Sequence, residues 1–441
     1  MPKQMTESLT PINGISELTK PFPAGKAQKT VSNSLITKIE GHGSVHMDWA
    51  KRTIKLQVTE GERLFEGLLV GRTAEEVHWI TPRICGVCPI AHNMAAVKAV
   101  EDALGITPNP TTIILRRLMM AGQMIQSHVL HLFFLVLPDY IGLDRATDLA
   151  AKDPKAFQRA LRLKEVADEI AACVPGRNVH PTTTALGGFH KLPDKEALEK
   201  LLKMLEKTSP DTSWTAGFFT SLPYPELDAG LELLSLKGGD GYSVYNGDTI
   251  ASGRDEEMSV RKYKEAIAEE VRDYSTAKFG SYKRREVMVG ALARISINGN
   301  KLTARAKRFI KGLDFNNPFH NNSAQAIEIL HFHQEAMELI EMLLSEGMNK
   351  TIACPAKNPP LKGIGAIEAP RGGLYLEVHL SGERKVTYAN IVTPTVQNLT
   401  SLEKSAQALL ERNSDSSKKK IRQLINMLIR AYDPCLTCSV H

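Results

Sequence analysis

The sequence reads RICGVCPIAH over residues 83–92 and DPCLTCSVH over residues 433–441, so a Cys-x-x-Cys pair lies near each end of the chain. Each pair can present two sulfurs on one side of a tight bend, which suits the capture of a soft metal ion. Apolar neighbours such as Ile84, Val87 and Leu436 would keep the thiolates dry. The two pairs can share one metal centre only if the fold brings the ends of the chain together, so we expect metal binding to be coupled to folding.

The spacing of the cysteines leaves several kinds of site open. A structural zinc site with four cysteines is the strongest alternative, although such a closed site has no use for the Arg, Asp and His residues that flank the pairs. Redox-active disulfides across each pair are another alternative. An iron–sulfur cluster is a third, although the closely spaced extra cysteine of ferredoxins is absent from the sequence. The remaining cysteines, Cys173 and Cys354, are expected to be small buried residues without a chemical role.

Composition excludes several classes of protein. The chain has 441 residues, of which 42% are hydrophobic and 24% charged. These values are typical of a folded protein and not of a disordered chain or a small disulfide scaffold. The net charge of +6 at pH 7 is spread along the sequence, so we expect no nucleic acid partner. The one dense basic run, residues 418–420, is predicted to lie on a solvated helix face.

Hydropathy predicts neither a membrane span nor an exported protein. No run of about 18 apolar residues occurs, so no transmembrane segment is expected. The longest apolar stretch, residues 129–137, is closed by Pro138 and is predicted to be a buried helix. The N-terminal region lacks the apolar core and the twin arginine of a secretory signal. We therefore expect a cytoplasmic protein.

Helical periodicity dominates the chain from Leu64 onward, with small alternating segments that predict strands. Predicted helices span residues 95–104, 111–137, 155–173, 195–206, 256–274, 324–344 and 402–429. Alternation predicts a hairpin or meander over residues 34–58, turns between short strands over 238–253, and a second small sheet over 363–395. The expected fold class is therefore mainly α with small β additions (α+β). We expect residues 1–33 to form a flexible N-terminal arm and residues 34–441 a single catalytic domain.

The two cysteine motifs, in this order, resemble those of the catalytic large subunit of nickel-iron hydrogenases. The resemblance continues through five further segments and so covers nearly everything from residue 34 to the end: residues 39–42 (IEGH), 65–67 (FEG), 177–181 (RNVHP), 324–328 (AQAIE) and 368–372 (EAPRG). It implies a long-helix bundle around a buried metal centre. It also implies an oxidoreductase that reversibly cleaves dihydrogen into protons and electrons.

In that family four cysteines bind a nickel-iron centre whose iron carries carbon monoxide and cyanide. The resemblance implies that Cys85 and Cys435 are terminal nickel ligands, whereas Cys88 and Cys438 bridge nickel to iron. Soft thiolates suit these metals. A histidine one helical turn beyond Cys88, His92, is expected to hydrogen-bond a cysteine sulfur rather than to bind metal.

The family also has a second metal site near the C-terminus, which holds magnesium or iron through a carboxylate, a terminal histidine, a main-chain carbonyl and waters. The resemblance assigns Glu66 and His441 to the two side chains. It further implies that the chain is the mature product of a precursor whose C-terminal extension has been removed.

The resemblance assigns roles to residues around the nickel-iron centre. The sulfur of Cys435 would pass a proton to Glu40, the start of the outward proton path. Arg371 would orient charge above the open metal position and pair with Asp433. Glu40 could instead only bind turn amides, and Arg371 could be an ordinary ion-pair partner. The cyanide and carbon monoxide pockets would be formed by Pro370, Leu374, Pro394 and Thr395.

One departure from the family pattern concerns the branch to which the chain is related. Many membrane-linked members have His-Asp-His where this chain has Gln126-Ser127-His128. A carboxylate near the centre is thus replaced by Ser127, which favours the cytoplasmic branch coupled to soluble electron carriers.

Electrons must leave through another polypeptide, because the sequence has no cysteines for electron-transfer clusters beyond the four motif thiolates. The resemblance implies a small iron-sulfur subunit as partner, with flavin or NAD(P)-binding subunits behind it and a carrier such as NAD(P) or ferredoxin. Two alternatives stay open: a hydrogen-sensing regulatory subunit with the same centre, and a zinc-stabilised scaffold. The four intact cysteines argue against a third, the related quinone-module subunit of respiratory complexes, which lacks these thiolates.

Overall fold

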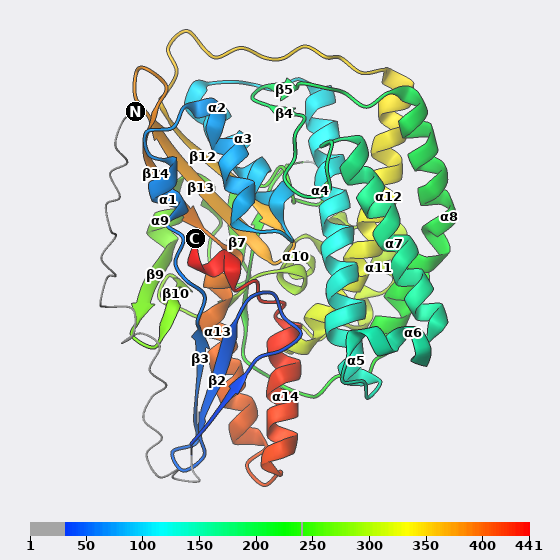
Figure 1. The fold of residues 1–441 in the computed structure, drawn as a ribbon, viewed down its shortest axis with the longest axis vertical. Helices are drawn as coiled ribbons and strands as arrows, with labels where there is room; N and C mark the ends of the chain where they lie inside the picture. Colours follow the sequence, from blue (N-terminus) through cyan, green and yellow to red (C-terminus); the bar gives the residue numbers. More distant parts are fainter. Residues whose placement is uncertain (1–30, 240) are drawn as a thin grey trace, which may run out of the picture.

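The computed structural model describes residues 31–239 and 241–441, so residues 1–30 of the predicted arm lie outside the described residues. Long helices form a bundle on one side of the molecule, and small sheets with their covering helices form the other (Figure 1). The C-terminal residues lie between these two parts. This arrangement confirms the predicted α+β class, with helices dominating. Residues 31–33, assigned to the arm by sequence, belong to a strand.

The described residues form helices α1–α14 and strands β1–β14. The helices are α1 Phe65–Leu69, α2 Ala74–Ile80, α3 Pro89–Leu104, α4 Pro110–Leu130, α5 Leu137–Tyr140, α6 Leu149–Lys152, α7 Pro154–Cys173, α8 Lys195–Thr220, α9 Tyr263–Ala266, α10 Ala291–Asn298, α11 Ala304–Lys307, α12 Asn321–Glu346, α13 Pro394–Arg412 and α14 Lys418–Ala431. The strands are β1 Val31–Leu35, β2 Gly43–Asp48, β3 Thr53–Val58, β4 Thr184–Ala185, β5 Gly188–Phe189, β6 Glu232–Lys237, β7 Thr249–Ser252, β8 Met258–Ser259, β9 Ile267–Arg272, β10 Ser275–Tyr282, β11 Val287–Met288, β12 Lys362–Ala369, β13 Gly372–Leu380 and β14 Val386–Val392.

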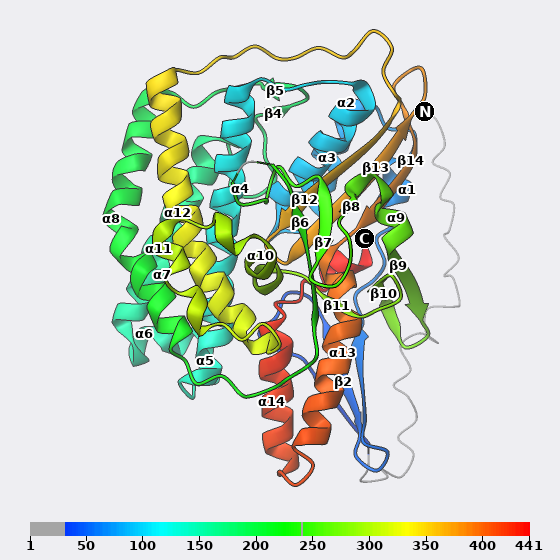
Figure 2. The same cartoon turned by 180° about the vertical axis from the view of Figure 1, so that it is seen from behind.

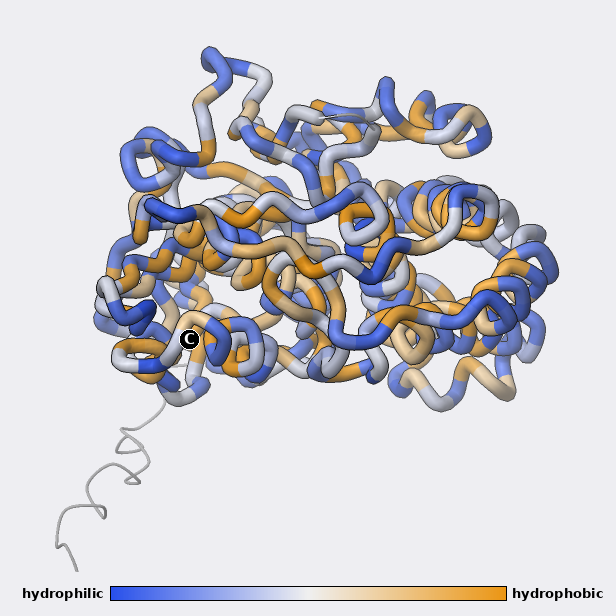
Figure 3. The backbone as a smooth tube through the Cα atoms, turned by 90° about the horizontal axis from the view of Figure 1, so that it is seen from above, coloured by the Kyte–Doolittle hydropathy of each residue, from blue (hydrophilic) through white to orange (hydrophobic). Residues whose placement is uncertain are grey.

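The bundle consists mainly of α4, α7, α8 and α12. Helix α12 packs against both α8 and α4, and α4 also packs against α7 (Figure 2). Asn109 caps α4 by accepting a hydrogen bond from the amide of Thr112 at 2.8 Å. A π-helical segment, His131–Val136, then joins α4 to α5. Seen from above, hydrophobic stretches lie mainly where helices face one another and hydrophilic ones on the outer turns (Figure 3).

The region from Pro110 to Tyr140 is one continuous helical stretch of 31 residues. It is long and apolar enough to cross a membrane by length and composition alone, which differs from the expectation that no stretch reaches that length. However, 83% of its most apolar window is buried inside the protein, where its apolar side chains contact the neighbouring helices. It is therefore a core helix of this fold, as predicted for residues 129–137.

Helix α3 lies directly on the sheet formed by β12, β13 and β14, whose strands are all antiparallel. Two glycines of β12 allow this approach. A Cβ at Gly363 would meet the carbonyl oxygen of Ala99 at 2.1 Å, and one at Gly365 would meet that of Ala95 at 2.0 Å. Because α3 starts next to Cys88, this close contact brings the first cysteine pair to the end of β12.

One predicted helix is wrong, and two others have different bounds in the structure. Residues 256–274 form β8, the short α9 and β9 instead of a helix, because β9 pairs with β10 and Tyr263 and Ile267 pack into the core beneath the sheet. Here tertiary contacts override the helix propensity of the Lys and Glu residues. The helix predicted over 402–429 is two helices, since the polar run 413–417 forms a turn and Ser417 caps α14. Helix α8 continues through Pro210 to Thr220, beyond the predicted end at residue 206.

The prediction that both single cysteines are buried is also wrong. Cys173 is half-buried and Cys354 is exposed. Cys354 lies in a surface segment between α12 and β12, where no helix or strand from residues 31–239 or 241–441 covers it.

Candidate metal centre

The four motif cysteines form one buried cluster. Their sulfur atoms all lie within 4.8 Å of one another. The distances are 3.4 Å from Cys85 to Cys435, 3.7 Å from Cys88 to Cys438 and 2.9 Å from Cys435 to Cys438. None of the four residues is more than 4% exposed. The fold therefore brings the two ends of the chain together, as the shared-centre hypothesis requires.

The first pair lies in the turn that precedes α3, and Cys88 occupies the N-cap position of that helix. The amides of Val87 and Cys88 both donate to the sulfur of Cys85 at 3.3 Å. These donors favour a thiolate. Gln123 on α4 fixes the turn, because its side chain donates to the carbonyl of Val87 at 2.8 Å and accepts from the amide of Ile90 at 3.0 Å.

The second pair lies beyond the end of α14. Asp433 has a positive φ of 50°, which turns the chain away from the helix axis toward the cluster. The segment then pairs with the N-terminal region, since the amide of Leu436 donates to the carbonyl of Glu40 at 3.1 Å. Gly41 permits this contact: its φ is 85°, and a Cβ there would meet the Cβ of Leu436 at 2.8 Å. The IEGH segment is thus the docking site of the C-terminal tail.

Arg63 links the two cysteine motifs. One of its terminal nitrogens, Nη2, donates to the carbonyl of Ile84 at 2.7 Å and also to the carbonyl of Thr437. Its own amide donates to the carbonyl of Val440 at 3.0 Å. The sequence analysis missed this residue and also Gln123. The only signal for Arg63 was its place just before the 65–67 segment, whereas nothing in the sequence marked Gln123.

Glu40 contacts the cluster directly. Its Oε2 accepts from the sulfur of Cys435 at 3.0 Å and from the amide of Thr437 at 3.1 Å, and its Oε1 accepts from the hydroxyl of Thr437. The carboxylate therefore both binds a turn amide and lies within proton-transfer distance of a cysteine sulfur.

The electrostatics of the cysteines by themselves are unfavourable for four thiolates. Burial raises the pKa of Cys435 and of Cys438 well above the ordinary value of a thiol. Hydrogen bonds from Cys435 and Cys438 lower the pKa of Cys85 well below that value. One thiolate is thus stabilised by its protonated neighbours, and a bound cation would be needed to deprotonate the others.

Arg371 lies at the tip of the β12–β13 hairpin, beside the cluster. Its Nε donates to the carbonyl of Asp433 at 2.7 Å, and its Nη2 donates to the carboxylate of Asp433 at 2.8 Å. Its Nη1 lies 3.3 Å from the hydroxyl of Ser127 on α4. Burial alone would lower the pKa of Arg371, but the charges of Asp433 and of the cysteines hold that pKa well above its usual value. The guanidinium is thus a fixed positive charge.

A small cavity adjoins the sulfurs. The amide of Cys435 donates to the hydroxyl of Thr395 at 3.0 Å, which fixes one wall of the cavity. His92 lies 3.7 Å from the sulfur of Cys438, and burial lowers the pKa of His92 to about 4, so its ring is neutral. The cavity is lined by Cys88, His92, Ala369, Pro370, Arg371, Leu374, Pro394, Thr395, Cys435 and Cys438. All the predicted pocket residues thus come together, and Ala369 is added to them.

Glu66 and His441 meet at the main chain of β14. The amide of Ile391 donates to Oε1 of Glu66 at 2.8 Å, and the carbonyl of Ile391 lies 2.8 Å from Nε2 of His441. Glu269 on β9 is a neighbour that nothing in the sequence indicated, and its Oε1 is buried without a hydrogen-bond partner among the described residues. Burial raises the pKa of Glu269, whereas the charges of Lys278 and His441 oppose this shift. A carboxylate, a carbonyl and an imidazole are ligands for a hard cation.

Comparison with known proteins agrees with this geometry. The family described as nickel-dependent hydrogenase matches residues 63–159 and 235–441, well over half of the chain. Sulfhydrogenase 1 subunit alpha of Pyrococcus furiosus is 36% identical, and the match covers 92% of this chain and 96% of the relative. The NAD-reducing hydrogenase HoxS subunit beta of Cupriavidus necator is 27% identical, with 92% and 94% covered.

Solved structures show the same fold. An NAD+-reducing NiFe-hydrogenase in the H2-reduced state matches with a TM-score of 0.84 at 24% identity, over 93% of this chain and 99% of that chain. The Ni-Fe-Se hydrogenase from D. vulgaris Hildenborough matches with a TM-score of 0.74 at 22% identity, over 93% of this chain and 100% of that chain.

Proposed function

The chain belongs to the nickel-dependent hydrogenase family as a catalytic large subunit, and we propose that it cleaves dihydrogen reversibly into protons and electrons at its four-cysteine centre. The observation that carries the proposal is the cluster of four buried sulfurs beside a cavity. A closed structural zinc site would have no use for such a cavity.

The residues present fit a nickel-iron group with small diatomic ligands. The sulfurs of Cys85, Cys88, Cys435 and Cys438 would together hold this group. When bound, the group would supply the Lewis-acid and redox chemistry of dihydrogen cleavage. The cavity offers the diatomic ligands an apolar wall at Leu374 and polar donors at Arg371 and Thr395. These donors would hold cyanide, and the apolar wall would receive carbon monoxide.

Two side chains of the chain would manage the proton. The sulfur of Cys435 would accept it, and Oε2 of Glu40, 3.0 Å away, would receive it next. Thr437 holds the carboxylate in place through its amide and its hydroxyl. Arg371, paired with Asp433 and Ser127, would supply a fixed positive charge at the cavity wall and would not itself transfer protons.

The site at Glu66 and His441 would hold magnesium or iron together with the carbonyl of Ile391. Its ligands lie close to the cysteines, because Nδ1 of His441 is 2.8 Å from the carbonyl of Cys438. A cation there would fix the C-terminal tail and hence the second cysteine pair.

The electrons would pass to an iron-sulfur partner subunit. The names of the relatives support this step, since both the sulfhydrogenase chain and the HoxS chain are named as subunits. The NAD-reducing relative also supports a soluble acceptor such as NAD(P), reached through flavin or NAD(P)-binding subunits. A cytoplasmic location follows from that acceptor.

Infrared spectroscopy of the purified complex, combined with metal analysis, tests the proposal. We expect about one nickel per chain and absorption bands of metal-bound carbon monoxide and cyanide. Cys88→Ser and Cys438→Ser should each abolish these bands, whereas Cys173→Ser, a half-buried cysteine outside the cluster, should leave them unchanged. Zinc without nickel, or nickel and iron without the bands, would refute the proposed centre. Intact bands without turnover would point to the hydrogen-sensing alternative.

A further inference from the structure

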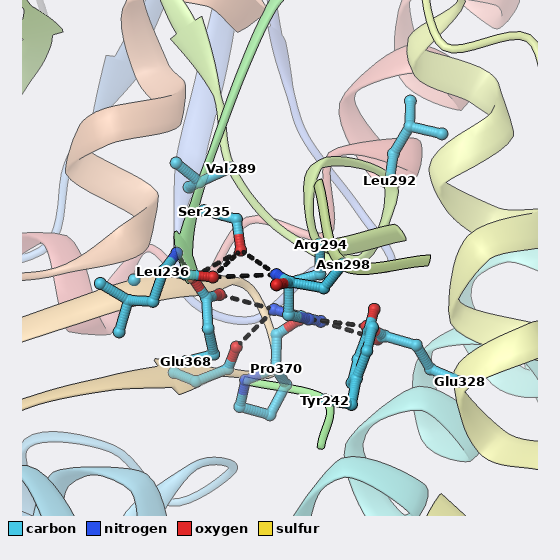
Figure 4. Close-up of polar contacts among 12 residues, drawn as sticks. Ser235, Leu236, Tyr242, Val289, Leu292, Arg294, Asn298, Glu328, Glu368 and Pro370 are labelled. Atoms are coloured by element: carbon cyan, nitrogen blue, oxygen red, sulfur yellow. Dashed lines mark hydrogen bonds and ion pairs between the residues drawn. The ribbon is translucent and has the colours of Figure 1, made fainter. Parts of the chain in front are cut away.

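Arg294 on α10 is a fully buried arginine that does not touch the cysteine cluster. Its Nε and Nη2 each donate to the carboxylate of Glu328 on α12 at 2.7 Å, and its Nη1 donates to Glu368 on β12 at 3.0 Å (Figure 4). The same guanidinium also donates to two main-chain carbonyls, that of Ala369 at 2.9 Å and that of Pro370 at 2.9 Å. An arginine has five N–H donors. All of them are therefore used here.

The two carbonyls belong to the wall of the candidate metal cavity. Strands β12 and β13 pair up to Ala369 and Gly372, so Pro370 and Arg371 form the complete loop of a tight hairpin. This tip is buried, and buried carbonyls need donors. One carbonyl precedes Pro370 and the other is its own, and the ring nitrogen of Pro370 has no hydrogen with which the tip could satisfy a carbonyl. The tip therefore depends on Arg294 for its orientation.

The acidic partners of Arg294 are themselves anchored. Glu328 also accepts from the hydroxyl of Tyr242 at 2.7 Å and lies 2.8 Å from Nε2 of His128 on α4. Glu368 also accepts from the amide of Leu236 on β6 at 2.7 Å and from the hydroxyl of Ser235 at 3.2 Å. Helix α12, strand β12 and the hairpin tip thus bind the guanidinium, and α4, β6 and Tyr242 hold its two carboxylate partners, which leaves it little freedom to rotate.

The network reaches Arg371 from two sides. Arg294 holds the carbonyl immediately before the amide of Arg371. Ser127, the neighbour of His128 on α4, contacts the guanidinium of Arg371 at 3.3 Å. Helix α4 therefore contributes His128 to the hydrogen-bond network that fixes the main chain at Arg371, and Ser127 to the contact that fixes the side chain of Arg371.

We infer that Arg294 is a positioning residue for the cavity wall: it fixes the hairpin tip so that Pro370 and Arg371 face the cysteine cluster. The effect on the metal ligands rests on the proposed function, but the effect on the hairpin does not. A lysine at position 294 would keep the positive charge but would offer only one donor nitrogen. It could not bind both carboxylates and both carbonyls, so the tip would relax.

Arg294→Lys is to be compared with Arg116→Lys in the purified complex. Arg116 is equally buried and is also paired through two hydrogen bonds to a glutamate, Glu101, but the main-chain carbonyl that it binds is that of Ala185, outside the cavity. Hydrogen–deuterium exchange of peptides that cover residues 362–380 should quicken in Arg294→Lys and stay unchanged in Arg116→Lys. This readout requires no bound metal.

In the loaded enzyme, Arg294→Lys should shift the infrared bands of the iron ligands and lower kcat by about 10- to 100-fold, as expected when a site is misplaced by a fraction of an ångström. Arg116→Lys should leave the bands in place. Tyr242→Phe removes one donor to Glu328 and should give a smaller change in the same peptides without loss of folding. Unchanged exchange at the tip in both Arg294→Lys and Tyr242→Phe would overturn the inference. If the wild-type enzyme lacked the bands but the tip still loosened, only the proposed function would fail.

Discussion

Replacing Glu40 by glutamine tests the proton path most directly. In the wild type, Oε2 of Glu40 accepts from the sulfur of Cys435 at 3.0 Å and from the amide of Thr437 at 3.1 Å. Glutamine has the same shape and keeps one carbonyl oxygen for these donors. Its amide nitrogen cannot take up a proton, so the relay from Cys435 should stop at the cluster.

Glu40→Gln should affect the reaction rate much more than it affects the stability of the fold. Loss of a positioned acid–base group lowers a rate by about 100- to 10,000-fold. The structural cost is smaller. The hydrogen bond from the Thr437 amide changes from charge-assisted to neutral and weakens by about 1 kcal/mol, while the amide nitrogen that replaces the other oxygen can donate to the Thr437 hydroxyl instead of accepting from it. Glu40→Gln should therefore fold and take up metal, but exchange deuterium between gas and water at least 100 times more slowly.

The assay is the exchange of D2 with solvent water, measured together with nickel and iron content. Thr437→Val is the matched control, because it removes the hydroxyl that binds Glu40 but leaves the carboxylate in place. It should lose less than about tenfold in exchange rate. Wild-type exchange in a fully metallated Glu40→Gln enzyme would show that the carboxylate is only a structural acceptor.

Three further predictions follow from contacts outside the proton path. Arg63→Met removes the donor shared by the two cysteine motifs. The free energy of unfolding, measured by urea denaturation, should therefore fall by about 3 kcal/mol. The control Arg83→Met, at an exposed position, should change that free energy by under about 0.5 kcal/mol. Glu66→Gln should lower the ratio of magnesium or second iron to nickel, and an unchanged ratio by elemental analysis would exclude this ligand. Burial lowers the pKa of His333 to about 4, so the unfolded state binds more protons and stability falls as pH drops from about 6.5 to 4. His333→Gln should reduce the slope of unfolding free energy against pH by about 1.4 kcal/mol per pH unit, measured by denaturation at several pH values. An unchanged slope would contradict the assignment to His333.

The sequence was a good guide where the signal is local. The residues of both cysteine pairs are close neighbours in the chain, and the softness of a thiolate is a property of the side chain itself. The long helices over residues 111–137 and 324–344 could also be predicted, because their apolar periodicity is regular. Prediction failed at residues 256–274, where the antiparallel pairing of β9 with β10 decides the structure against local propensity.

The sequence by itself determined the chemical nature of the centre: four thiolates with apolar flanks, which favour a soft metal. Only the tertiary structure decided that these thiolates meet, because the meeting depends on contacts between residues that are hundreds of positions apart, such as Leu436 with Glu40. The supporting residues Arg63, Gln123 and Arg294 became visible only there. Each acts through hydrogen bonds to main-chain groups of another segment, and such bonds require no particular side chain at the partner position and so leave no pattern in the sequence.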